Sequence, residues 1–400
     1  MESRQWLPLL AILFIFALIF RIPLLAVFSS MLLVVIGLAS WWQRHSLDGV
    51  IYKRRPHYRR SFPGEEVPLT LEVENRKLLP ISWLRIRDPW PKAIGPENEE
   101  VLAPTHIPTE GLLTNVFSLR WYERARRKYT LLFRKRGKYS VGPARLESGD
   151  LFGLYEKSGE QGPAELFTVF PALLPFRDLE LPAEDPFGDR RSRRRLYEDP
   201  NQPIGVRDYH PEDSFRRVHW PATAHTGELQ VKVYQPTSAN VMVVCLNVST
   251  FPRHWEGTYP ELLEHLVKVA ATLVDKGIQD GYRVGLVSNG CLAHADQPFR
   301  IPPGRSPKQL ATLLEALAGV TPVVTAPFER FLIKEVPRLP YGATLLIVTG
   351  VTTAELVETL VKLRQKGRQI TLLSFAQQAP PEMQGIRIFH HPFEESKISE

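Results

Sequence analysis

The 400-residue sequence predicts a multidomain protein with an N-terminal transmembrane helical hairpin, an antiparallel β-sandwich-like domain and a C-terminal α/β domain. Residues 6–42 are almost wholly apolar, residues 50–177 alternate apolar and polar positions over short segments, and residues beyond 240 alternate strand and helix patterns. The expected boundaries are 1–43 for the hairpin, 44–178 for the β-rich domain, 179–239 for a linker with a densely charged segment, and 240–400 for the α/β domain.

The apolar N-terminal stretch is too long for one membrane span and is interrupted at Arg21 and Pro23. Split there, it gives spans of about 15 and about 20 residues, which favours a hairpin over a cleaved signal peptide. Lys and Arg are abundant after Trp42, whereas the turn carries only Arg21. The positive-inside rule therefore predicts a multi-pass protein of the inner (cytoplasmic) membrane with both termini in the cytoplasm, and with Trp6, Trp41 and Trp42 at that interface. A buried helical pair in a soluble protein is the alternative.

The middle of the chain is predicted to be β-structure. Five segments have strand character, at residues 67–73, 81–86, 114–119, 128–133 and 165–170. The 35 prolines concentrate between residues 56 and 236 and favour edge strands and stiff connections over a helical bundle. An antiparallel sandwich or barrel is the expected result.

The chain is basic, with a formal net charge of +7, and its arginines and lysines cluster in residues 120–138 and 190–195. Aromatic residues do not interleave with these clusters, and neither a helix-turn-helix nor an RNA-binding motif occurs, so nucleic acid is not expected as a partner. Contact with the lipid bilayer or with a protein is the preferred interpretation. Cys245 and Cys291 have neither disulfide nor metal spacing and are expected to be buried free thiols.

The C-terminal region is predicted to form a mostly parallel sheet flanked by helices. Strand patterns cover residues 240–247, 282–288, 343–349 and 369–375, and helix patterns cover residues 259–276, 307–318 and 353–366. Gly277 and Gly367 are expected to end two of the helices, and Ser306 to cap the third. Since no glycine-rich phosphate loop follows any of these strands, no nucleotide or other cofactor is expected.

The most charged segment lies just before the first of these strands. Pro211, Glu212 and Asp213 suit the start of a short helix, in which Asp213 would pair with Arg217 four residues later. Trp220-Pro221 is expected to end this helix. Residues 227–234 then alternate as a half-exposed strand does.

These residues resemble the signature of the bacterial family catalogued as "domain of unknown function 58", and residues 205–225 are called the signature segment below. The matching positions are Gly205, Arg207, Tyr209, Asp213, Arg216, Val218, Trp220 and Ala224. The sequence departs from the family pattern at Glu212, where Gly is usual, and at His225, where Arg is usual. Residues 134–139 and 148–154 resemble two further hallmarks of the family, so the resemblance covers most of the chain.

The resemblance implies a membrane hairpin, a β-rich domain and a degenerate von Willebrand factor A-like domain, with a MoxR-type AAA+ ATPase as partner. A-like domains bind a divalent cation through D-x-S-x-S after their first strand. Here Asn247 and Phe251 replace the first and last positions and Ser249 remains, while Thr349-Gly350 stands where a later aspartate is common. Because a hard cation needs anionic oxygen, no metal is expected at this degenerate site.

Two functions remain open on the sequence. The preferred one is a membrane-anchored scaffold or adaptor with no catalytic residues, whose interaction residues are Gly205, Arg207, Tyr209, Asp213, Arg216, Trp220 and Ala224. The alternative is a membrane-bound hydrolase that uses the acids and histidines from Asp208 to His225. The histidines do not have zinc spacing, and neither a nucleophile elbow nor a His-Glu-x-x-His motif is present. Convergence of these groups in an open pocket would favour the hydrolase.

Overall fold

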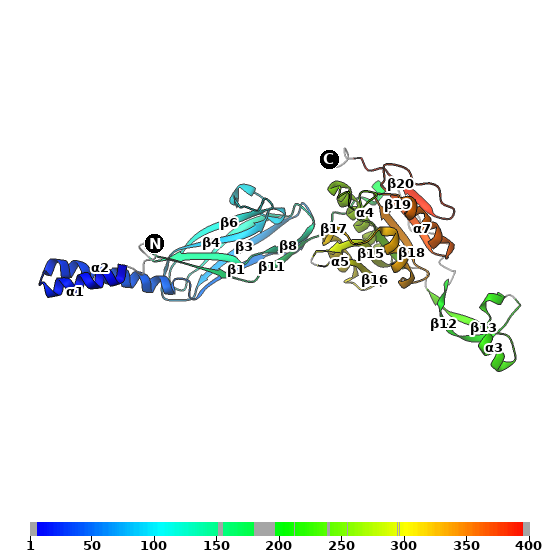
Figure 1. Cartoon of the computed structure of the whole chain (residues 1–400), viewed down its shortest axis with the longest axis horizontal. Coiled ribbons are helices and arrows are strands. Elements are labelled where there is room, and N and C mark those ends of the chain that lie inside the picture. Colours follow the sequence, from blue (N-terminus) through cyan, green and yellow to red (C-terminus); the bar gives the residue numbers. More distant parts are fainter. Residues whose placement is uncertain are drawn as a thin grey trace. The chain divides into compact units, whose positions relative to one another are not determined.

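The computed structural model describes residues 6–150, 155–179, 197–211, 213–237, 241–253, 255–293, 295 and 297–394. The chain divides into two compact units, Met1–Val169 and Phe170–Glu400. The predicted combination of an N-terminal apolar helix, several β-sheets and a mixed α/β C-terminal region is confirmed (Figure 1).

Two apolar helices begin the first unit, α1 (Trp6–Ile19) and α2 (Pro23–His45), and they lie side by side as an antiparallel pair (Figure 1). Arg21 sits in the turn between them with a left-handed φ of 52°. Small side chains, Ala17, Ser29 and Ala39, are almost fully buried and allow the helices close contact. Most other apolar side chains of the pair are exposed. By length and composition α2 is able to cross a membrane, whereas α1 is shorter.

The strands that follow form three sheets. The first is antiparallel and has the order β1 (Val50–Pro56), β3 (Glu66–Asn75), β7 (Arg124–Leu132). The second has the order β10 (Glu156–Gln161), β9 (Ala144–Gly149), β4 (Ile81–Pro91), β6 (Glu110–Leu119), β5 (Leu102–Pro104). A small third sheet joins β2 (Arg60–Ser61), β11 (Glu165–Val169) and β8 (Gly137–Val141). Strands β3, β4, β6, β7 and β11 coincide with the predicted strand segments. One hydrophobic core, with Leu69, Trp90 and Phe167 at its centre, is built from all three sheets.

A buried ion pair joins the first two sheets. Arg54 of β1 donates through Nε and Nη2 to the two carboxylate oxygens of Asp88 on β4, both at 2.7 Å, and the two side chains are 1% and 0% exposed. The Tyr52 hydroxyl donates to the same carboxylate at 2.7 Å. Burial is the main cause that raises the pKa of Tyr52, so its hydroxyl stays a neutral donor. The pair fixes how β1, the strand that follows α2, sits against β4.

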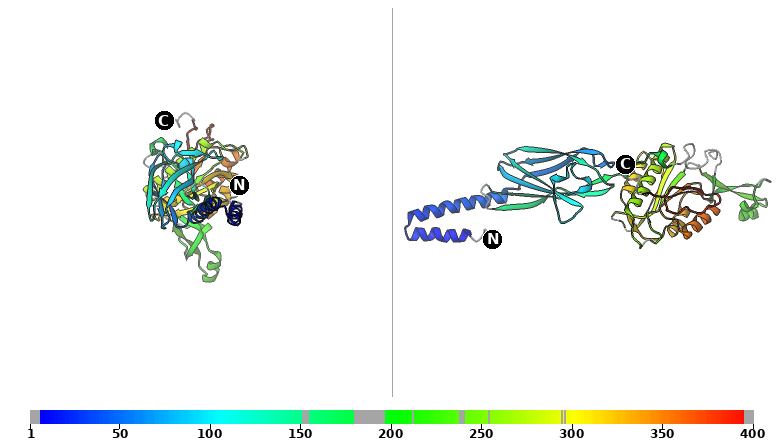
Figure 2. Two further views of the ribbon diagram at one scale, coloured as in Figure 1. Left: turned by 90° about the vertical axis from the view of Figure 1, so that its left-hand side faces the viewer. Right: turned by 90° about the horizontal axis from the view of Figure 1, so that it is seen from above.

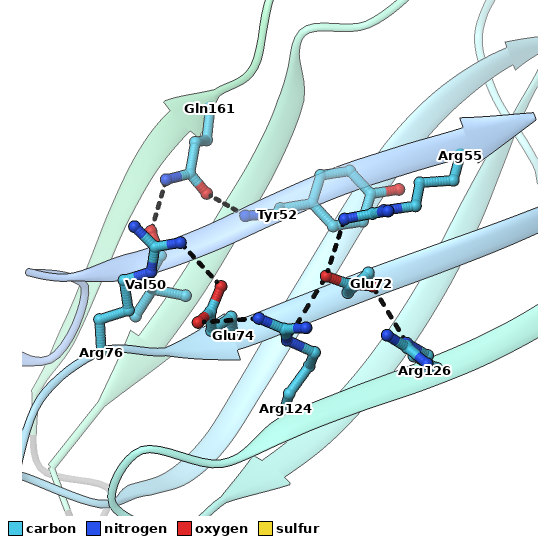
Figure 3. A network of polar contacts seen from close by, with 9 residues as sticks. All are labelled: Val50, Tyr52, Arg55, Glu72, Glu74, Arg76, Arg124, Arg126 and Gln161. Carbon is cyan, nitrogen blue, oxygen red and sulfur yellow. Dashed lines mark hydrogen bonds and ion pairs between the residues drawn. The ribbon is translucent and has the colours of Figure 1, made fainter.

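Arginines on the outer face of the first sheet are held by glutamates (Figure 3). Glu72, whose side chain is 4% exposed, accepts from Arg126 Nε at 3.0 Å and from Arg55 Nη2 at 3.3 Å, and Arg124 lies 3.5 Å away. Burial acts to raise the pKa of Glu72, but the bond from Arg126 and the neighbouring charges outweigh it and lower that pKa. Part of the basic cluster in residues 120–138 is therefore occupied by intramolecular pairs.

The second unit contains a sheet with the order β16 (Pro298–Gly304), β15 (Arg283–Leu292), β14 (Val241–Leu246), β18 (Thr344–Thr349), β19 (Gln369–Ser374), β20 (Arg387–His390), with β17 (Val320–Val324) paired to β15. Strands β15, β14, β18, β19 and β20 are parallel, whereas β16 and β17 pair with β15 in antiparallel orientation. The helices that flank this sheet are α4 (Pro260–Gln279), α5 (Gln309–Ala318), α6 (Phe328–Glu335) and α7 (Ala354–Gln365).

Helices cover both faces of this sheet (Figures 1 and 2). Helices α6 and α7 pack on the face that carries Val241, Val243 and Cys245. Helix α4 packs on the opposite face, over Met242. The predicted strands coincide with β14, β15, β18 and β19, while β16, β17, β20 and α6 were not predicted because their sequences are short or rich in proline.

Two predicted helix boundaries are wrong. Helix α4 continues through Gly277 to Gln279. Gly277 faces Met242, where a Cβ would come within 2.3 Å of the methionine Cε, so the glycine serves close packing and does not end the helix. The glycine that adopts a left-handed φ, of 82°, is Gly281. Helix α5 begins at Gln309 rather than Pro307, since Ser306 accepts from the Lys308 N–H in a preceding turn. Thr353 does cap α7, through the Leu356 N–H at 3.2 Å.

Breaking the buried pair should destabilise the protein much more than breaking an exposed one. Replacing Arg54 with Met leaves the Asp88 carboxylate buried without its cation, at a cost of about 3 to 5 kcal/mol. The matched control is Arg55→Met, because Arg55 follows directly on the outer face and its side chain is 56% exposed. Denaturant unfolding in detergent should show less than about 1 kcal/mol for the control. Equal losses for the two variants would contradict the assignment.

Stability should also depend on pH through His265 of α4. Its ring packs against Phe375 and Phe393, with centroids 4.8 and 5.4 Å apart, and burial lowers its pKa to about 4. Since the unfolded histidine titrates near pH 6.5, the unfolded state binds more protons between these values and stability falls as the pH drops from about 6.5 to 4. We expect a loss on the order of 2 kcal/mol that His265→Gln removes. Identical pH profiles for the two proteins would exclude this contribution.

Candidate functional site

The signature segment forms the tip of a two-stranded hairpin (Figure 1). Strand β12 (Tyr197–Asp208) pairs in antiparallel orientation with β13 (Gln230–Thr237), and a 3-10 turn (Phe215–Arg217) and helix α3 (Trp220–Thr226) lie between them. Residues 197–202, which were predicted to belong to the linker, instead begin β12. Pro200 and Pro203 argued against a strand here, and the register of β12 shifts around Pro203. The basic residues 190–195 lie outside the described residues.

An ion pair closes the loop that follows β12. Arg207 donates through Nη1 and Nη2 to the two carboxylate oxygens of Asp213, at 2.7 and 2.6 Å. The same carboxylate accepts the His210 N–H at 2.9 Å, and Arg207 also donates to the Asp208 carbonyl at 3.0 Å. The side-chain bond from Arg207 is the main cause that lowers the pKa of Asp213 to about 2. The loop is thus held by a charge-assisted pair at any pH above about 3.

The local helix predicted around Asp213 is wrong. Asp213 pairs with Arg207 in place of Arg217, and the backbone turns at His210–Asp213 without continuing as a helix; Glu212 lies outside the described residues. Trp220-Pro221 begins helix α3 rather than ending one, since proline is accepted in a first helical turn where its missing N–H has no partner to lose. His219 is the N-cap, and its Nδ1 accepts the Ala222 N–H at 3.0 Å.

Three acid and base groups of the segment, Asp208, Asp213 and His219, are used for its own folding. Asp213 holds Arg207, and the Asp208 carboxylate accepts from Gln230 Nε2 at 2.6 Å. His219 Nδ1 caps α3, which places the proton of a neutral ring on Nε2. Asp208, Asp213 and His219 are therefore each bonded to a different partner, and none of them lines the hollow described below.

Large apolar side chains of the hairpin are exposed. The exposed fractions are 66% for Phe215 and 64% for Trp220, and Phe215 stacks on Tyr209 with ring centroids 5.4 Å apart. Arg216 and Ala224 are exposed as well. A Cβ added at Gly205 would meet nothing within 4 Å, so this signature glycine is not required by local packing. Exposed aromatic and arginine side chains of this kind are typical of protein interfaces.

The second candidate lies at the carboxyl ends of β14, β15 and β18. Asn247 Oδ1 accepts the Ser249 N–H at 3.0 Å and Asn289 Nδ2 at 3.1 Å, while Asn247 Nδ2 donates to Thr349 Oγ1 at 3.0 Å. Thr349 Oγ1 in turn donates to the Val351 carbonyl at 2.7 Å. Asn247, Asn289 and Thr349 are almost fully buried. Neutral hydrogen bonds thus occupy the side-chain oxygens that an A-like cation site would use.

A shallow hollow of about 280 Å³ opens beside this network. It is lined by Asn247 and Ser249 together with exposed Trp255, Arg253, Arg330 and other residues of the neighbouring loops. Among the described residues, no group of three or more His, Cys, Asp or Glu side chains could hold a metal ion. The geometry therefore offers a partly aromatic, partly charged surface.

The sequence did not single out Asn289, which closes the network. Asn289 donates to Asn247 and accepts the Val248 N–H at 3.0 Å. Thr352 and Ser374, whose hydroxyls are 3.1 Å apart at the end of β19, were missed in the same way. Their positions in the sequence could have indicated them. They lie at or near the carboxyl ends of predicted strands, and polar residues at the carboxyl ends of adjacent parallel strands meet at one edge of a sheet.

Comparison with known proteins bears on the same region. Residues 205–376 match the family described as "Protein of unknown function DUF58", so the resemblance expected from the signature is confirmed over those residues. The "Uncharacterized protein YeaD" of Bacillus subtilis (strain 168) is 23% identical over 229 residues, which are 57% of this chain and 52% of that protein. The match thus spans about half the length of that relative.

Similarity to solved structures is weak. The sporulation control protein Spo0M of Bacillus subtilis is 18% identical over 30% of this chain and 49% of its own, with a TM-score of 0.19. A PapD-like domain of human CEP192 is 20% identical over 28% of this chain and 87% of its own, with a TM-score of 0.14. Scores of this size carry no conclusion about the fold.

Magnesium or calcium should leave the thermal stability unchanged, because the Asn247 and Thr349 oxygens are already bonded and carry no charge. Asn247→Ala should by contrast destabilise the second unit by about 1 to 3 kcal/mol, since it leaves Asn289 and the Ser249 N–H without their acceptor. Thermal melts with each cation and with chelator provide the measurement. A cation-dependent rise in Tm that Ser249→Ala abolishes would show that a metal does bind.

Proposed function

We propose that this protein is a membrane-anchored cytoplasmic scaffold or adaptor that presents the signature segment and an A-like α/β domain to a protein partner, a MoxR-type AAA+ ATPase. The observation that carries the proposal is that the charged signature residues form hydrogen bonds within the hairpin itself. Arg207, Asp213, Asp208 and His219 build a closed tip by bonding to one another, to the Gln230 side chain and to the backbone, while Phe215 and other apolar side chains remain exposed.

The anchor is proposed to be a hairpin of two spans with both ends in the cytoplasm. Helix α2 has the length for this, and α1, with 14 residues, requires local thinning of the bilayer. Arg44 lies in the last turn of α2 and the basic residues of β1 follow the helix, whereas the turn between α1 and α2 carries Arg21. This asymmetry in Lys and Arg supports the proposed orientation.

The domain assignments are likewise proposals. Sheets β1-β3-β7 and β10-β9-β4-β6-β5 around one core support a sandwich. The parallel strands β14, β15, β18 and β19, covered by helices on both faces, support an A-like domain. The neutral network at its carboxyl edge supports recognition of a partner without a bound cation.

The hydrolase remains the competing function, and one observation bears against it. His219, the best-placed proton acceptor of the signature, has its Nδ1 directed at the Ala222 N–H, and Asp213 is held by Arg207. A catalytic pair would need these groups to face each other and a substrate.

Two variants distinguish the scaffold from the hydrolase. Arg207→Ala removes both bonds to Asp213 and should open the loop, whereas His219→Asn keeps an N-cap acceptor for α3 and removes the imidazole that a hydrolase would use as proton acceptor. The scaffold requires His219→Asn to complement a deletion strain and Arg207→Ala to fail, with the ATPase co-purifying from membranes only with the first. Arg216→Ala, at an exposed signature arginine, tests direct contact.

The reverse ranking would overturn the proposal. If His219→Asn is inactive and Arg207→Ala is active, with both proteins folded and present in membranes, the hydrolase is favoured. Membrane content is followed by immunoblot and folding by limited proteolysis, so loss of the protein is not mistaken for loss of function.

A further inference from the structure

The carboxyl end of α2 is fastened to the β-sheets of the first unit. Lys77 Nζ donates to the carbonyls of His45 and Ser46, and Lys157 Nζ donates to the Arg44 carbonyl. Gln43 Nε2 donates to the Glu156 carbonyl at 2.7 Å. The last carbonyls of a helix have no partners within the helix, so these side chains supply them. The end of α2 is therefore held against the β-sheets by several bonds.

Two turns lie together at this end of the sheets, residues 76–80 between β3 and β4 and residues 120–123 between β6 and β7. The Asn75 side chain joins them by donating to the carbonyls of Leu79 and Arg120, at 3.0 and 2.9 Å. The Tyr122 N–H donates to the Lys77 carbonyl at 3.3 Å, and the Arg76 N–H donates to the Gly49 carbonyl at 2.9 Å, just before β1. Both turns are thus tied to the point where the chain leaves α2.

These turns expose large apolar side chains. The exposed fractions are 72% for Leu78 and 64% for both Trp121 and Tyr122. Tyr122 adopts a left-handed φ of 52°, which is unusual for an aromatic residue. Arg76 and Arg120 are exposed beside them. Aromatic and basic side chains together are typical of proteins at the headgroup layer of a membrane.

The length of α2 sets the depth of these turns. Its 23 residues span about 35 Å, which exceeds the hydrocarbon thickness of about 30 Å. The last turn of α2, with half-exposed Trp41 just before it, therefore lies in the headgroup layer. Since Lys77 and Lys157 bond to that last turn, the residues beside Lys77 lie at the same depth.

We propose that Leu78, Trp121 and Tyr122 form a second membrane contact, inserted into the anionic headgroup layer beside the end of α2. The proposal rests on the proposed membrane anchoring of α2 and adds a point of attachment that the helices do not provide. Attachment at two places prevents the β-sheets from turning freely about the α2 axis. The first unit is then held at a fixed tilt to the bilayer.

Fluorescent labels on single cysteines test this in the full-length protein. The native Cys245 and Cys291 are both buried, so an introduced exposed cysteine is labelled selectively. The variants are Trp121→Cys at the proposed contact, Val34→Cys in the exposed middle of α2, and Tyr58→Cys as matched control. Tyr58 is an aromatic residue, 59% exposed, beyond the end of β1 that is remote from α2.

The labelled proteins are reconstituted in vesicles of phosphatidylethanolamine and phosphatidylglycerol that carry nitroxide either on the headgroup or in mid-chain. We expect mid-chain nitroxide to quench the label at position 34. Headgroup nitroxide should quench the label at position 121 several-fold more than the label at position 58.

Three other results would each overturn the second contact. Equal quenching at positions 121 and 58, with position 34 quenched, overturns the second contact and leaves the anchor intact. A label at 121 that is shielded from water but not quenched by lipid assigns this surface to a protein and also overturns it. If position 34 is not quenched, the anchor itself is wrong and the second contact falls with it.

Discussion

The buried pair between Arg54 and Asp88 is the interaction on which the β-sheets of the first unit depend, and pairs of an arginine with a poorly exposed carboxylate recur in the second unit. Arg54 and Asp88 join two sheets in the core of the first unit, and Arg207 and Asp213 close the loop of the signature hairpin. In the second unit Glu335, whose side chain is 10% exposed, pairs with Arg338 at 2.9 Å. In each place the guanidinium offers several donors in a fixed plane, which a lysine could not do. A basic chain thus uses many of its arginines for folding, which leaves fewer of them for an external anion.

The two candidate surfaces differ in how they are built. The signature hairpin satisfies its polar groups internally and exposes aromatic side chains, whereas the carboxyl edge of the parallel sheet buries Asn247, Asn289 and Thr349 in a neutral network. In the signature hairpin the carboxylates of Asp208 and Asp213 are already hydrogen-bonded, and the three residues of the network carry no charge. Both are suited to binding by shape and apolar contact, in which a few rigid aromatic and arginine side chains supply most of the energy.

Periodicity was sufficient to predict strands and helices such as β3, β4, β14, α4 and α7, because these have long and regular apolar patterns. The role of a single residue could not be predicted where its residue type fits two different structural roles. Gly277 is a close-packing glycine and not a helix end, and Pro221 begins a helix that it was expected to follow. The partner of Asp213 was placed four residues later on a helix, yet it lies six residues earlier on a strand. Contacts that depend on tertiary structure, such as Asn75 joining two turns beside α2, have no local signal in the sequence.

The most direct test of the scaffold places a photoreactive benzoylphenylalanine at Phe215 in living cells, with the same substitution at exposed Tyr58 as control. After irradiation, adducts are purified from membranes and identified by mass spectrometry. A protein-docking signature predicts one dominant adduct at position 215, with an AAA+ ATPase, that is absent at position 58 and is lost when Asp213→Asn weakens the loop. Equal and unspecific crosslinking at positions 215 and 58, in protein that still complements a deletion, would contradict the docking role of the signature segment.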